Sequence, residues 1–236
     1  MSFNGFPREG IELLLDIELN NNKEWFEANR DRHERYIVAP CKAYIEEIGE
    51  HLQILVPTIH ATPKTNRSLF KIYRDSRLHP TEPIKTKIGI ICWQGGGHRM
   101  QSSSFYMHYD SEGVFFATGI RNFKSPLLKV YREYIADISR REELHSILTE
   151  LEEIGYKIPE PKYKRYPRGF DSSMPYAYLS RFGAVYAYST MRLNAIFYSR
   201  GVIKKSMSIY SDMFRLHQWV YELTLYGESQ SSIDDI

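Results

Sequence analysis

The sequence has few cysteines, no long apolar run and no secretory signal. Its two cysteines, Cys41 and Cys92, lie far apart in the sequence without paired spacing. We therefore expect no disulfide framework, and we expect the protein to reside in a reducing compartment. No apolar segment approaches the roughly 20 residues that a membrane-spanning helix needs. The first residues, MSFNGFPREGIELL, lack a basic region followed by an apolar run and a cleavage site. We therefore expect a soluble cytoplasmic protein without a membrane partner.

Signatures of metal binding and of catalysis are also missing. The histidines and cysteines show no HExxH, CxxC or other short ligand spacing. There is no GxSxG motif, and the run Gly95-Gly96-Gly97 has neither the Walker spacing nor GxGxxG. The sequence predicts no metal and no cofactor, and it leaves open whether the protein is an enzyme.

What the sequence does contain is a local excess of positive charge. The formal net charge of the chain is only +2. Residues 64–99, however, carry eight lysines and arginines against two carboxylates, a local net charge of +6. Such clustering favours an anionic ligand, or an acidic group on a partner, at this segment.

Helical spacing of apolar residues dominates the N-terminal part of the chain. It extends over about the first 57 residues, and Pro40 predicts a break or kink near residues 38–39. Asn21, followed by Glu24 three residues later, resembles a capping box for a second helix. Helical patterns return at 125–138, 141–154 and 203–221.

Alternation with period two predicts strands in the middle of the chain. It begins at Leu69, recurs over 84–93, and reaches a hairpin whose turn is Asp110-Ser111-Glu112-Gly113; a further strand is expected within 186–197. Residues 155–175 are typical of a long loop. Helices and hairpins in separate stretches favour an α+β fold, with a mainly antiparallel β-sheet packed with N-terminal and C-terminal helices. We expect a single domain over 1–226 and a polar tail over 227–236.

Three segments resemble motifs of one family. They are NNKEWFEANR (21–30), RSLFKIYRDSR (67–77) with Lys85-Thr86, and YKRYPRGFD (163–171). In this order they are similar to the domain of unknown function 2461 family, a group of conserved hypothetical proteins. The resemblance implies a single intracellular domain and no established activity. The loop 78–85 is shorter and less basic than in the family, so a ligand held by that loop would differ here or be absent.

The arginines of the central motif permit three interpretations. Strand alternation places Arg74 and Asp75 on opposite faces, so each needs another partner. In the leading hypothesis Arg67, Arg74 and Arg77 hold a small phosphate- or carboxylate-bearing ligand, Lys85 adds charge, and Asp75 orients an arginine or acts as a base. Alternatively, the arginines form a purely structural network.

The third interpretation is a nucleic-acid-binding module. It would use the basic region 64–99 together with the loop 163–168, where tyrosines alternate with lysine and arginine. The sequence does not predict the oligomeric state.

Overall fold

The computed structural model describes residues 2–75 and 77–234, with only the backbone described for 231–234. It divides into two compact units. Unit 1 contains 1–92, 106–116 and 190–209, and unit 2 contains 93–105, 117–189 and 210–236. The boundaries between the units fall within strands and within one helix. The predicted single domain, 1–226, stays a prediction.

Unit 1 begins with helices, as the apolar spacing predicted. In chain order they are α1 (Arg8–Leu19), α2 (Lys23–Ala28), α3 (Arg30–His33), the π-helical turn η1 (Glu34–Val38) and α4 (Ala39–Leu55). The expected irregularity near Pro40 takes the form of this π turn, in which the Ala39 N–H donates to the Glu34 carbonyl five residues back. Pro40 then occupies the first turn of α4, where its missing N–H is tolerated.

Helix α1 runs very close to this π turn. A Cβ atom on Gly10 would lie 2.6 Å from the Tyr36 carbonyl oxygen, so glycine is the residue that permits the approach. The capping residue of α2 differs from the predicted Asn21. Asn22 accepts the hydrogen bond from the Trp25 N–H instead.

Asn21 connects two distant segments. Its side-chain amide donates to the Ile84 carbonyl at 2.9 Å and accepts from the Ile84 N–H at 3.0 Å. The side chain thus bonds to both backbone polar groups of Ile84, as a residue of a neighbouring strand would, and it holds the start of α2 against residue 84.

The α+β class and the antiparallel sheet are confirmed. The sheet has five strands in sequential order: β1 (Ile59–His60), β2 (Ile88–Gln94), β3 (Ser104–Tyr109), β4 (Gly113–Ile120) and β5 (Val185–Arg192). Strands β3 and β4 form the predicted hairpin, and Asp110 accepts from the backbone N–H groups of Glu112 and Gly113 in its turn.

The segment before β2 corrects the sequence prediction. The strand expected from Leu69 is an irregular extended chain, joined to its neighbours by isolated bridges such as Leu69 with Ile90 and Tyr73 with Ile84. The strand expected from Ile84 begins at Ile88. Alternation of residue types could not reveal this, because a strand also needs continuous backbone pairing.

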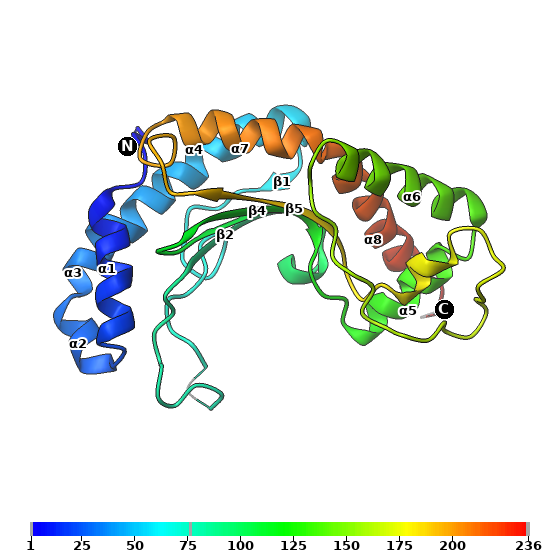
Figure 1. Cartoon of the computed structure of the whole chain (residues 1–236), viewed down its shortest axis with the longest axis horizontal. Helices are drawn as coiled ribbons and strands as arrows, with labels where there is room; N and C mark the ends of the chain where they lie inside the picture. Colours follow the sequence, from blue (N-terminus) through cyan, green and yellow to red (C-terminus); the bar gives the residue numbers. More distant parts are fainter. Residues whose placement is uncertain (1, 76, 235–236) are drawn as a thin grey trace. The chain divides into compact units, whose positions relative to one another are not determined.

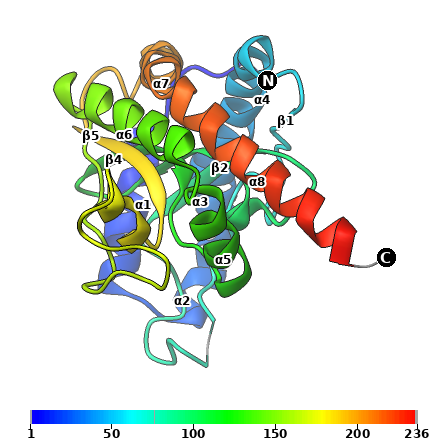
Figure 2. The same ribbon diagram turned by 90° about the vertical axis from the view of Figure 1, so that its right-hand side faces the viewer.

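In unit 1, helices α4 and α7 (Gly201–Asp212, whose first nine residues belong to this unit) lie side by side along the strands (Figures 1 and 2). The Tyr44 hydroxyl on α4 donates to Ser206 Oγ on α7 at 2.7 Å. Rings fill the core beneath these helices: Phe6 stacks on Phe197 with centroids 4.8 Å apart and contacts Tyr109. Phe6 thus joins the segment before α1 to strand β3 and to the segment after β5.

Unit 2 contains α5 (Ser125–Tyr134), α6 (Ile138–Glu153) and α8 (Phe214–Asp234), together with the short 3-10 helices η2 (Arg99–Gln101) and η3 (Ala177–Arg181). The single helix expected over 203–221 is two helices, α7 and α8, with a break at Met213. Helix α8 continues through the start of the predicted tail, 227–236, whose last two residues lie outside the described part.

A buried arginine on α6 contacts the end of the loop 155–175, which belongs to the same unit. Arg141 on α6 is 5% exposed, and its guanidinium donates to the carbonyls of Pro175, Ile135 and Ala136. Backbone carbonyls thus satisfy this cation inside the fold. In the part of the chain that the structure describes, no helix is long and apolar enough to cross a membrane.

Candidate ligand-binding site

Two arginines of the predicted cluster pair with separate carboxylates among the residues that the structure describes. Arg74 pairs with Glu82, with 3.2 Å between Nη1 and Oε2. Arg77 binds the Asp75 carboxylate through two hydrogen bonds, from Nε to Oδ1 at 3.0 Å and from Nη2 to Oδ2 at 2.6 Å. This contact holds the pKa of Asp75 below its usual value. The expectation that Arg74 and Asp75 need separate partners therefore agrees with the contacts.

The other two predicted site residues lie in the same region. Arg67 is exposed in a turn, where its backbone N–H donates to the Lys64 backbone carbonyl at 3.0 Å. Lys85 Nζ donates to the backbone carbonyl of Lys71 at 2.5 Å. Of the five residues, the structure brings Asp75 and Arg77 into direct contact and gives Arg74 and Lys85 partners outside the set.

The tyrosine-rich loop 163–168 meets cations of its own unit. The Arg132 guanidinium lies 5.0 Å from the centroid of the Tyr163 ring, and that of Arg181 lies 5.2 Å from the Tyr166 ring. Each of these rings therefore has a face engaged in a cation–π contact within the fold.

A pocket of about 240 Å³ lies where the first two motif segments meet in unit 1. The α2–η1 region forms one side and residues 65–73 with Ile88 form the other. Its walls include six buried apolar side chains, namely Phe26, Ile37, Val38, Leu69, Ile72 and Ile88. The pocket therefore offers mostly apolar surface, as is usual for small-molecule sites.

Helical spacing explains one wall. Phe26, His33 and Ile37 stand seven and four residues apart, so they share a face of the α2–η1 helical stretch. The Phe26 ring meets the edge of His33, with centroids 5.1 Å apart, and that of Tyr73 at 5.5 Å. Phe26 thus contacts both sides of the pocket, His33 on the helical side and Tyr73 on the extended side.

His33 is the titratable group with the most perturbed environment in this pocket. Burial lowers its pKa from 6.5 to about 4, although the nearby Glu34 carboxylate opposes the change. The imidazole is therefore neutral at pH 7 and can offer one N–H donor and one acceptor. Within the described residues, no hydrogen bond reaches either ring nitrogen.

Two further charged residues that line the pocket, Arg30 and Glu34, are paired with other side chains. Glu27 accepts from the Tyr73 hydroxyl and binds Arg30 Nε at 3.1 Å. Burial and the hydrogen bond to Glu27 raise the pKa of Tyr73. Glu34 pairs with Lys42 at 3.2 Å. These contacts leave neither Arg30 nor Glu34 as an isolated charge.

Lys71 differs from these groups. It lines the pocket and is exposed, and in the chain as described its ammonium group has no ion-pair or hydrogen-bond partner. An ammonium group at the edge of an apolar pocket can bind an anion.

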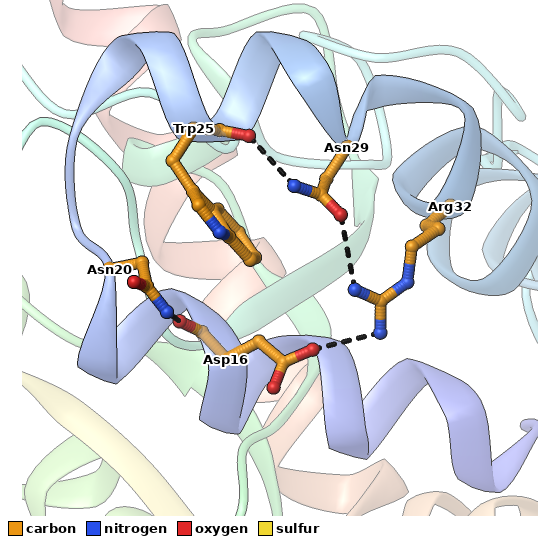
Figure 3. Close-up of polar contacts among 5 residues, drawn as sticks. All are labelled: Asp16, Asn20, Trp25, Asn29 and Arg32. Carbon is orange, nitrogen blue, oxygen red and sulfur yellow. Dashed lines mark hydrogen bonds and ion pairs between the residues drawn. The ribbon is translucent and has the colours of Figure 1, made fainter.

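A polar network holds the helices of this wall on α1 (Figure 3). Arg32 donates to Asp16 Oδ2 at 2.8 Å and to Asn29 Oδ1 at 3.1 Å, and the Asn29 amide donates to the Trp25 carbonyl. The Trp25 ring points from α2 toward α1 (Figure 3). The network therefore bridges the break between α2 and α3, next to His33.

Sequence reasoning missed His33 and Lys71 as site residues. The signal was present, since Phe26, His33 and Ile37 share a helical face and Lys71 belongs to the central motif. By strand alternation Lys71 shares a face with Leu69 and Tyr73, opposite to the face of Arg74.

Among the described residues, neither the cysteine thiols nor the possible metal ligands form a second candidate site. Cys41 and Cys92 are buried and unbridged, and burial raises the pKa of each to about 12, so neither is a thiolate at neutral pH. The described residues contain no group of three or more histidines, cysteines and carboxylates placed to hold a metal ion.

Fold and pocket together define an α+β protein with a cation beside an apolar cavity. A family model described as conserved hypothetical protein, DUF2461, matches residues 9–219, and the chain belongs to this family. Among curated proteins, none matches the chain.

Proposed function

We propose that the protein binds a small anionic ligand in the pocket between α2–η1 and residues 65–73. The observation that supports this most is Lys71, a cation without a protein partner among the described residues, which lines the same pocket as the neutral imidazole of His33. Lys71 would supply the charge and His33 an N–H donor for a carboxylate or phosphate oxygen.

This proposal moves the anion away from the arginine cluster of the sequence hypothesis. Arg74 and Arg77 each have a carboxylate partner, which favours a structural role for both. The nucleic-acid alternative receives less support, because Tyr163 and Tyr166 already stack with arginines of their own unit. Unbridged buried cysteines support a cytoplasmic location.

The first test is a thermal-shift panel of phosphate, nucleotides and carboxylates at low ionic strength. We expect at least one anion to raise the melting temperature of the wild type, and the Lys71→Met variant to lose that shift. Lys64→Met is the matched control, since Lys64 is an exposed lysine outside the pocket lining. An equal loss in both variants would show a non-specific charge effect and reject the site.

A further inference from the structure

The charges around the pocket define how much negative charge a ligand can carry. Arg30 is paired with Glu27, and Glu34 with Lys42. His33 is neutral at pH 7. Lys71 is thus the one lining cation without a carboxylate partner among the residues described. A ligand with a single negative charge balances it, whereas a polyphosphate would bring uncompensated charge.

The walls define the rest of the ligand. Leu69, Ile72 and Ile37 are at most 8% exposed, and they surround the cavity together with Phe26. A strongly hydrated group would lose its water there without finding donors or acceptors on these walls. An apolar body gains free energy from the same contact, about 25 cal/mol for each Å² removed from water.

The volume limits the size of that body. A pocket of about 240 Å³ equals the liquid volume of roughly eight water molecules. One six-membered ring, or a chain of similar bulk, fills such a space together with a carboxylate at the Lys71 side.

Resting on the proposed function, we propose that the ligand is a small apolar monocarboxylate, with its ring or chain against Phe26 and Ile72 and its carboxylate between Lys71 and His33. Lys71 contributes the countercharge and His33 donates one N–H. The walls then select against neutral polar molecules and against highly charged phosphates.

Isothermal titration calorimetry at pH 7 with benzoate, hexanoate, benzamide and inorganic phosphate tests this assignment. Benzoate or hexanoate should bind at least ten-fold more tightly than benzamide, which keeps the ring but lacks the charge, and than phosphate. Lys71→Met should weaken the carboxylate at least ten-fold, and Lys64→Met should leave it unchanged.

The outcomes separate this inference from the proposed function. If phosphate or a nucleotide binds in a Lys71-dependent way while both carboxylates fail, the monocarboxylate assignment is overturned and the anion site stands. If no anion binds, both fall. Equal affinity for benzoate and benzamide would also overturn the assignment, because the charge would then have no role.

Discussion

At the scale of single residues, the partner of a charged group decides its role better than its position in a motif does. Arg74 and Lys71 lie three residues apart in the same motif. Arg74 reaches Glu82, whereas Lys71 lines an apolar pocket and lacks a partner in the described chain. The two residues also differ in burial, since the Arg74 side chain is 24% exposed whereas Lys71 is an exposed residue. The Glu82 carboxylate that pairs with Arg74 is 62% exposed.

The Arg74→Ala variant tests this distinction. An ion pair with one exposed partner contributes little, so we expect a loss of less than about 1 kcal/mol in the free energy of unfolding. Anion binding at the pocket should not change. Urea unfolding and calorimetry measure the two effects. Lost binding at unchanged stability would restore the arginine cluster as the site.

At the scale of elements, the N-terminal helices are fixed to the extended segment by a few side chains. Asn21 forms two hydrogen bonds with the backbone of Ile84, 63 residues away. Asn20, its neighbour, makes only a local contact of this kind in the described structure, from its amide to the Asp16 carbonyl. The two asparagines therefore provide a matched pair.

We expect Asn21→Ala to cost about 1–3 kcal/mol, because it leaves a partly buried N–H and carbonyl of Ile84 without their partner. Limited proteolysis should also cut the segment 61–87 faster. Asn20→Ala should change the free energy of unfolding by less than about 0.5 kcal/mol. Equal costs for the two variants would contradict the role assigned to Asn21.

The elements that the sequence predicts well are those whose signal is local. The hairpin turn at Asp110–Gly113 and the N-terminal helices depend on residues close in the chain. Residues 69–74 were misassigned because their residue types alternate while their burial does not: Leu69 and Ile72 are the buried ones, and the segment contacts α2–η1 and β2 without ladder pairing. The candidate site escaped prediction for a related reason: only the fold makes Lys71 and His33 line the same pocket.

At the scale of the whole molecule, each unit contains a histidine that burial keeps neutral. In unit 2, His217 is fully buried, stacks on Phe105 and has Ser103 and Gln94 within 2.9 Å of its two ring nitrogens. Burial lowers its pKa to about 3. In unit 1, His33 has a pKa of about 4.

These lowered pKa values predict acid sensitivity in both units. Because the unfolded chain binds a proton near pH 6.5 and the folded histidine does not, this part of the stability is complete above pH 6.5 and falls as the pH drops toward 4. Each histidine contributes a slope of about 1.4 kcal/mol per pH unit.

Urea unfolding between pH 7 and pH 4 measures this slope. His217→Gln cannot bind the proton, so its slope should be smaller by about 1.4 kcal/mol per pH unit, whatever its stability at pH 7. His51→Gln, at an exposed histidine, is the control. An unchanged slope for His217→Gln would show that this residue is not a source of the acid sensitivity.

The π turn at Glu34–Val38 has a consequence for sequence change in this family. A π turn holds one residue more than the corresponding α-helical turn, and one residue corresponds to about 100° of helical rotation. Deleting a single residue there would restore α-helical pairing and turn His33 and Phe26 away from Lys71 without altering any of the three. Relatives with a different helix length at this point would therefore keep the motif yet lose the pocket.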